Sequence, residues 1–548
     1  MSDNPGGLDF AGPVAANDRV VGSGPRKWLP RGNRMRTQMS RDGAGMPIRR
    51  IRWLVLGVIS AAVSATLPLG PASADPVDGI PGGLESFYHQ RLDWKPCNDA
   101  VLDGAGAQCA GVVVPLDYNR PDSRTLTVAI SRIPATDPAH RHGIMLSNPG
   151  GPGGPGLSMM ADLQDRFTPD VRARYDLIGM DPRGIGRSDP VNCALPLPTM
   201  LFSAGFDGFG FARDTALAAA LAASCTTPDP EKARQITTRN TARDMDVIRS
   251  AFGERTLSYY GGSYGTYLGA VYTQMFPQHS DRMVFDSAVD PDRYWIGIYQ
   301  DMGAVNEAAL DEWATWAARR DADYHFGSSG PQVRAFVEDM IRRAAAHPVI
   351  GNGYLIDEHT APMMLLALLS DPQKNADLAE VVRIVADAVS GRPVDMEQLK
   401  TKISGPVQLN ASGMAAVLCG DKAAPRDPAW YYRNIENVRA TQPVFGAFAN
   451  NITACAFWPE PVEALTAVHN STPALILQAT RDTRTPYHQG LALHRDLTAS
   501  RMVTSADTRV HGVLRAGTNS CVNDIVNTYF RDGTLPEADT TCQLDPGR

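Results

Sequence analysis

The chain has 548 residues, of which 43% are hydrophobic and 20% are charged. This length exceeds what one hydrophobic core supports, so we expect a large domain that carries a substantial insertion. The composition is that of a folded globular protein and excludes wholesale disorder. A formal net charge of −7 excludes a strongly basic surface, so nucleic acid is not an expected partner.

The N-terminal region has the layout of an export signal. A basic cluster at 49–52 precedes an apolar run at 53–67 and the small residues Ala72, Ser73 and Ala74. This order predicts a signal peptide at 46–74 that is cleaved after Ala74. The apolar run is interrupted and short, which disfavours the alternative of an uncleaved membrane anchor.

Residues 1–45 are rich in Gly and Arg and show no apolar period. We expect this segment to be disordered, or to lie upstream of a true translation start at Met46. The mature protein is expected to be secreted, either extracellular or associated with the cell wall, with no stable membrane span. The sequence does not indicate an oligomeric state.

All eight cysteines follow Ala74. An even number of cysteines in an exported chain favours disulfides over metal ligation, and no C-x-x-C spacing supports a metal site. Pairing successive cysteines closes the shortest segments. The expected disulfides are therefore Cys97–Cys109, Cys193–Cys225, Cys419–Cys455 and Cys521–Cys542.

From Gly111 onward, short apolar runs alternate with longer helical patterns. This rhythm predicts an α/β fold with a mostly parallel, doubly wound sheet. The expected strands in this part of the chain are 111–115, 126–130, 143–147, 175–180, 256–260 and 283–286.

The rhythm changes after Asp290, where 305–320, 332–346 and 378–389 are helical stretches with no strand pattern between them. Strands resume at 474–478 and 501–504. We therefore predict a helical cap at 291–465, inserted between two parts of the core at 75–290 and 466–548, because a loop of this length is implausible.

Gly261-Gly262-Ser263-Tyr264-Gly265 matches the G-x-S-x-G pattern. In this pattern a serine occupies a tight turn between a strand and a helix, where glycine neighbours avoid steric conflict. A strand is expected before the motif and a helix at 266–276 after it. Ser263 is thus the predicted nucleophile, and a purely structural turn is the alternative.

A serine nucleophile needs a histidine base and a carboxylate that orients the base, in the chain order Ser, acid, His for folds with this turn. Asp482 follows the strand at 474–478, and His511 follows the last expected strand in a loop with Gly512. These two complete the predicted triad. The alternatives are that Asp482 only initiates a helix and that His511 is a solvated loop residue.

Acyl transfer also needs backbone N–H groups directed at the developing oxyanion. We predict Tyr264, which follows the nucleophile, and Gly151, in the glycine-rich loop at 148–156, as the two donors. No G-x-G-x-x-G in this loop opens a helix with an acid about 20 residues further on, so the loop is not interpreted as a dinucleotide site. The predicted chemistry is complete without a metal or a nucleotide, so no cofactor and no metal are expected. The segment 181–188 is assigned a structural role beside the site.

Taken together, these motifs resemble the secreted actinobacterial tripeptidyl aminopeptidases, relatives of prolyl aminopeptidases with a TAP-like C-terminal domain. The resemblance covers nearly all of the mature chain and rests on 148–153, 181–184, 261–266, Asp482 with Thr485 and Pro486, and the tail 520–542. It implies an α/β-hydrolase fold with a large helical cap. It also implies release of short peptides, such as tripeptides, from free N-termini through an acyl-enzyme.

Two other functions are compatible with the same residues. An extracellular carboxylesterase or lipase would employ an identical triad, and a non-catalytic binding protein would keep the fold alone. An exopeptidase also needs a carboxylate for the substrate α-amine. Asp421, beside Cys419, is one of many acids in the predicted cap, and the sequence does not single out one of them.

Overall fold

The computed structural model describes residues 83–193, 200–351, 354–403, 410–517 and 519–545. The predicted signal peptide and the segment before it lie outside these described residues. Within the described ranges, no helix has both the length and the apolar character needed to cross a membrane.

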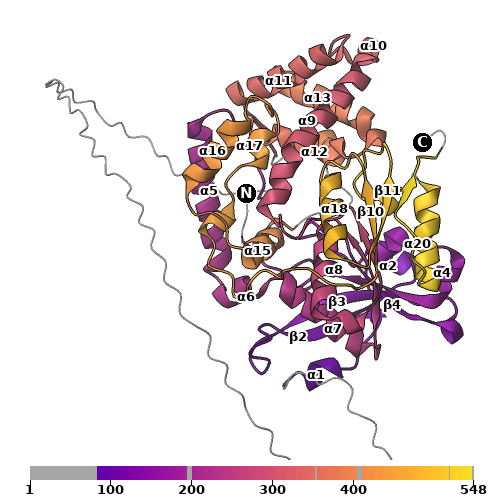
Figure 1. The fold of residues 1–548 in the computed structure, drawn as a ribbon. Helices are drawn as coiled ribbons and strands as arrows, with labels where there is room; N and C mark the ends of the chain where they lie inside the picture. The colour runs from indigo at the N-terminus through magenta and orange to yellow at the C-terminus, as the bar shows by residue number, and fades with distance from the viewer. Residues whose placement is uncertain (1–82, 194–199, 352–353, 404–409, 518, 546–548) are drawn as a thin grey trace, which may run out of the picture. The chain divides into compact units, whose positions relative to one another are not determined.

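A ten-stranded sheet forms the core, with the strand order β1-β2-β3-β5-β4-β6-β7-β10-β11-β12 (Figure 1). The strands on the antiparallel side are β1 Lys95–Pro96, β2 Gln108–Pro115 and β3 Thr125–Ile133. The parallel strands are β5 Tyr175–Met180, β4 Gly143–Asn148, β6 Leu257–Gly262, β7 Ser280–Asp286, β10 Ala474–Ala479, β11 Arg501–Ser505 and β12 Thr540–Cys542. The predicted α/β class and mostly parallel sheet are confirmed.

The central strands β4, β5 and β10 are buried at every position, as expected for parallel strands covered on both faces. Side chains alternate between two hydrophobic cores. Leu146 packs in one core with α7 (Thr238–Ala251) and α8 (Tyr264–Met275). Met145 packs in the other core with α4 (Pro169–Arg174) and α20 (Ser520–Asp532). The loops that follow β6, β10 and β11 therefore meet at one edge of the sheet.

The chain between β7 and β10 is mainly helical. Its helices are α9 Ile296–Ala318, α10 Asp321–Tyr324, α11 Gly330–Ala346, α12 Ala361–Leu369, α13 Asn375–Ala388, α14 Met396–Ile403, α15 Ala411–Asp421, α16 Pro428–Val438 and α17 Gly446–Ala449, with the 3₁₀ turns η4 Pro372–Lys374 and η5 Ala454–Phe457. Figure 1 shows α9, α11, α12 and α13 gathered in one group. They share a separate hydrophobic core that includes Trp313, Leu365 and Val382.

Two features of this region differ from the expected arrangement. The expectation of helices alone was wrong, because β8 (Val349–Gly351) pairs with β9 (Tyr354–Ile356) as a small hairpin. Strands this short give no recognisable alternation. In addition, α5 (Gly208–Thr226), which precedes residue 291, packs against α16 and η5. The exact domain boundaries stay a prediction.

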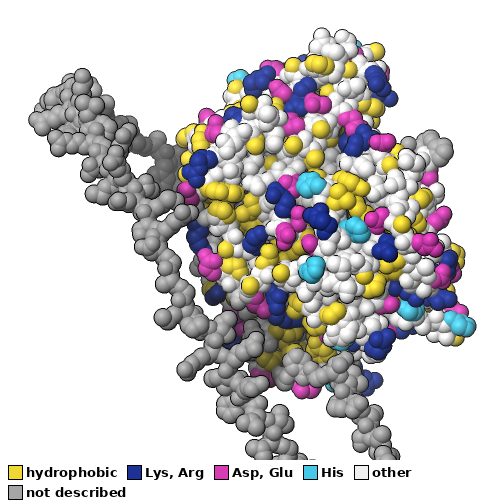
Figure 2. Space-filling model, viewed as in Figure 1, with side chains coloured by type: hydrophobic (Ala, Val, Ile, Leu, Met, Phe, Trp, Pro, Cys, Tyr) yellow, Lys and Arg dark blue, Asp and Glu magenta, His cyan; other side chains and the backbone are white. Residues whose placement is uncertain are grey.

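The eight cysteines form disulfides in the four expected pairs. Cys419 and Cys455 join α15 to η5, and Cys521 and Cys542 join α20 to β12. Each bond closes a local segment rather than linking distant parts of the chain. On the face drawn in Figure 2, basic and acidic side chains are interspersed.

Candidate active site

Ser263 occupies a sharp turn between β6 and α8, with φ 55° and ψ −126°. A non-glycine residue in this left-handed region is strained and is held there by its surroundings. The flanking glycines are needed for space: a Cβ on Gly261 would lie 2.4 Å from the Gly265 carbonyl oxygen, and one on Gly265 would lie 2.5 Å from that of Asn148. Ser263 itself is half-buried.

His511 and Asp482 lie together at the same edge of the sheet. Nδ1 of His511 is 2.9 Å from Oδ2 and 3.0 Å from Oδ1 of Asp482. A neutral imidazole that donates from Nδ1 to the carboxylate leaves Nε2 with a free lone pair, which is the form a general base needs.

The Asp482 carboxylate is held in place by its own loop. Oδ1 accepts hydrogen bonds from the Arg484 amide (2.8 Å) and the Thr485 amide (3.0 Å), and Oδ2 accepts one from the Thr485 hydroxyl (3.0 Å). Burial acts to raise the pKa of Asp482, but His511 and the two amides outweigh it, and the pKa lies below its usual range. The carboxylate therefore stays charged beside the imidazole.

Asp286, at the end of β7, connects the turn of Ser263 to the segment after His511. Its backbone oxygen accepts the Ser263 amide at 2.9 Å. Its carboxylate accepts the Val513 amide (2.7 Å), the Leu514 amide (3.0 Å) and the Tyr260 hydroxyl (2.6 Å). Sequence reasoning missed this residue, although an aspartate ending a buried strand at this edge was a usable signal.

The glycine-rich loop lies directly against the turn of Ser263. A Cβ on Gly150 would be 2.5 Å from the Gly262 oxygen and 3.0 Å from the Tyr264 nitrogen. Tyr264 is the first residue of α8, so its amide has no acceptor within the helix. The next loop residue, Gly151, has a φ of 111°. The two predicted oxyanion donors thus belong to segments in mutual contact.

Asp181 and Arg183 stabilise the surroundings of the glycine-rich loop. Asp181 accepts the amides of Gly156 (2.8 Å) and Leu157 (3.1 Å), which fixes the end of the glycine-rich loop. Nε of Arg183 donates to Asp244 at 2.7 Å, and both side chains are fully buried. These contacts fit the structural role expected for 181–188.

Asp421 is also a structural carboxylate. It accepts hydrogen bonds from the Thr238 amide (2.7 Å), the Thr238 hydroxyl (2.6 Å) and the Tyr294 hydroxyl (2.8 Å). Burial is the main cause that raises the pKa of Asp421 to about 6. These contacts tie α15 to α7 and leave little capacity for a substrate ammonium group.

Two family models match the chain. The model described as alpha/beta hydrolase fold matches residues 143–327, and the model described as TAP-like protein matches residues 442–542. Together with the serine turn and the sheet, these matches define a serine hydrolase of the α/β-hydrolase fold.

Three relatives refine this class. A tripeptidyl aminopeptidase of Streptomyces lividans is 34% identical over 478 residues, which cover 82% of this chain and 86% of the relative. Carboxylesterase B of Mycobacterium tuberculosis is 29% identical over 89% of this chain and 96% of its own. Serine protease Hip1 of the same species is 26% identical over 83% of this chain and 91% of its own. The chain belongs to the tripeptidyl aminopeptidase family.

Proposed function

We propose that the protein is an exported serine exopeptidase that releases short peptides, such as tripeptides, from free N-termini. Ser263 is the nucleophile, His511 the general base and Asp482 the residue that orients it. The observation that carries this proposal is the 2.9 Å contact between His511 Nδ1 and Asp482 Oδ2, at the edge of the sheet where the turn after β6 presents Ser263.

These proposed roles give the following reaction. Nε2 of His511 takes the proton of the Ser263 hydroxyl while Oγ attacks the substrate carbonyl carbon. The amides of Tyr264 and Gly151 stabilise the oxyanion of the tetrahedral intermediate. His511 then protonates the departing amine as the C–N bond breaks, and a water molecule, activated in the same way, hydrolyses the acyl-enzyme.

The extracellular location rests on the predicted signal peptide and on the four disulfides, which persist in oxidising compartments. Sequencing the N-terminus of the protein recovered from culture medium tests it. We expect the chain to begin at Asp75. A cell-retained chain that still contains residues 46–74 would contradict export with cleavage.

A fluorophosphonate probe tests the nucleophile. The wild type and a matched surface variant, Ser123→Ala, should label, and Ser263→Ala should not. Labelling of Ser263→Ala would place the nucleophile elsewhere. A wild type that does not label would favour the non-catalytic binding protein. His511→Ala should slow labelling by several orders of magnitude.

A peptide-library digest read by mass spectrometry tests the substrate class. We expect short peptides to leave from free N-termini, with N-acetylated copies of the same peptides left intact. The second candidate is an extracellular carboxylesterase, which the relative named carboxylesterase B favours. Hydrolysis of acyl esters with no cleavage of any peptide would select that candidate.

A further inference from the structure

The side chain of Tyr264 is held by a chain of hydrogen bonds that leads away from the serine turn. Its hydroxyl lies 2.6 Å from the hydroxyl of Thr238, the first residue of α7. The Thr238 hydroxyl in turn lies 2.6 Å from Oδ2 of Asp421, the last residue of α15. All three side chains are buried. Three helices, α7, α8 and α15, therefore meet at the residue that follows Ser263.

The direction of this chain follows from its protons. Burial is the main cause that raises the pKa of Asp421 to about 6, so the carboxylate is charged at neutral pH and only accepts hydrogen bonds. Thr238 gives its single hydroxyl proton to Asp421, which leaves its oxygen as the acceptor for Tyr264. Burial, and after it the charge of Asp421, raises the pKa of Tyr264. The phenol therefore keeps the proton that it donates.

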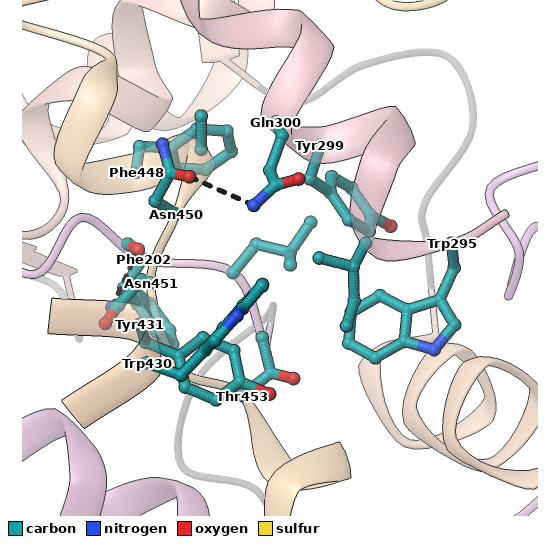
Figure 3. Close-up of a pocket in the computed structure, with 13 residues that line it drawn as sticks. Phe202, Trp295, Tyr299, Gln300, Trp430, Tyr431, Phe448, Asn450, Asn451 and Thr453 are labelled. Carbon is teal, nitrogen blue, oxygen red and sulfur yellow. Dashed lines mark hydrogen bonds between the residues drawn. The ribbon is translucent and has the colours of Figure 1, made fainter. Parts of the chain in front are cut away.

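The Asp421 end of the chain is fixed by further contacts. Its Oδ1 accepts the Thr238 amide at 2.7 Å, and its Oδ2 accepts the Tyr294 hydroxyl at 2.8 Å. The indole of Trp295, labelled in Figure 3, donates from Nε1 to the Lys422 carbonyl at 3.3 Å. The chain directly before α9 thus holds the end of α15 in place.

The position of the Tyr264 amide matters because this amide is one of the two proposed oxyanion donors. The amide belongs to the first residue of α8, and the buried phenol of the same residue anchors this start of the helix. An oxyanion donor must lie about 2.7–3.1 Å from the oxyanion, and a misplacement of about 1 Å costs roughly 100-fold in rate. Whatever holds the phenol therefore bears on catalysis.

We propose that Thr238 and Asp421 position the Tyr264 amide for the oxyanion, so that α15 supports the oxyanion hole. Both residues act through Tyr264 and are positioning residues rather than catalytic residues. The inference rests on the proposed nucleophile and oxyanion donors, and it adds the residues on which the geometry of one donor depends.

The test compares a p-nitrophenyl ester with its thiono counterpart, in which C=S replaces C=O. Sulfur is the weaker hydrogen-bond acceptor, so a misplaced oxyanion donor slows the oxygen ester more than the thiono ester. Thr238→Val removes the hydroxyl but keeps the shape and the hydrogen bond from the backbone amide to Asp421. It should lower kcat/KM for the oxygen ester by about 10- to 100-fold and for the thiono ester by less than about 3-fold.

Two matched variants separate positioning from a general loss of structure. Thr238→Ser keeps the hydroxyl and should retain the wild-type ratio of the two kcat/KM values. Thr241→Val, three residues further along α7, removes a buried hydroxyl that donates to the Thr237 carbonyl at 2.9 Å. It should also retain that ratio. Circular dichroism should show that all three variants fold.

Asp421→Ala tests the far end of the chain. It should narrow the ratio as Thr238→Val does, and the double variant should lose no more than either single variant, because both changes break the same chain. A folded Asp421→Ala variant with the wild-type ratio would overturn the role of Asp421. If this variant does not fold, the Thr238 variants decide the proposal.

This inference and the proposed function fail separately. If Ser263→Ala hydrolyses the ester as fast as the wild type, the proposed nucleophile is wrong. If Ser263→Ala is inactive and Thr238→Val keeps the wild-type rates, or slows both esters equally, the positioning role is wrong and the proposed function stands.

Discussion

At the scale of single residues, Asp286 joins two separate parts of the site, and the sequence analysis did not single it out. It is fully buried, and burial is the main cause that raises its pKa. Its backbone oxygen bonds the Ser263 amide, while its carboxylate bonds the amides that follow His511. We expect it to be a positioning residue for the proposed nucleophile and base.

Asp286→Asn tests this role. An amide in place of the carboxylate puts an N–H group against an N–H donor, so the segment after His511 should shift. A displacement of about 1 Å costs roughly 100-fold in rate, and we expect kcat to fall by about 10- to 100-fold with KM nearly unchanged. Steady-state hydrolysis of a fluorogenic substrate measures both constants.

Asp281→Asn, at the other end of β7, is the matched control and should retain kcat. Circular dichroism should show that both variants fold. A normal kcat for Asp286→Asn would show that the amide contacts of Asp286 do not position His511.

At the scale of elements, the C-terminal end of α12 receives side chains from the loops that contain Asp482 and His511. Arg484, two residues after Asp482, donates to the Leu366 carbonyl at 2.8 Å. Arg509, two residues before His511, donates to the Leu369 carbonyl and, at 3.0 Å, to Oδ1 of Asn375. The last carbonyls of a helix carry partial negative charge. The helix thus anchors both loops, and the cap contributes to their positions.

Arg509→Lys should weaken this anchor, because an ammonium group cannot reproduce a planar guanidinium fork. We expect a loss of about 1–3 kcal/mol in unfolding free energy and a kcat reduced by about 10-fold. Urea denaturation and steady-state kinetics measure the two effects. Arg501→Lys, at the start of β11, is the control, and an Arg509→Lys variant with the kinetics of this control would contradict the anchoring role.

Long elements of this fold could be predicted from the sequence, whereas short ones could not. The helix α13 and the strand β5 lie within a few residues of their expected ranges, because their apolar pattern repeats over enough positions to be recognised. The strands β1, β8, β9 and β12 have only two or three residues each. Pairing with neighbouring segments of the chain, rather than a local sequence pattern, determines where they form.

At the scale of the whole molecule, His359 links α5 to the region that follows β9. Its Nδ1 lies 2.7 Å from the Ser203 oxygen and 3.2 Å from Oδ2 of Asp214, and its Nε2 lies 3.3 Å from Glu358. Burial lowers the pKa of His359, but the bonds to Asp214 and Glu358 outweigh it and raise the pKa to about 9, while the nearby charge of Arg213 acts to lower it. The imidazolium therefore holds two distant segments together at neutral pH.

His359→Gln tests this link through the pH dependence of stability. Because the folded pKa is raised from 6.5 to about 9, the stabilisation is complete below pH 6.5 and is lost as the pH rises through 9. We expect the variant to be less stable than wild type by about 1–3 kcal/mol at pH 6 and by clearly less at pH 10. Urea denaturation at both pH values measures this difference, and a penalty that does not change with pH would contradict it.

The sequence by itself determined the features that depend on local patterns. The serine turn was predictable because its glycines avoid steric clashes within a span of five residues. The positions of Asp482 and His511 were predictable because each follows a recognisable strand. The cysteine pairs were predictable because each closes a short segment. Only the tertiary structure decided the contacts of Asp286 and the anchoring of Arg509 on α12. These features join residues that are more than a hundred positions apart, and packing of the whole chain, rather than any local pattern, brings such residues together.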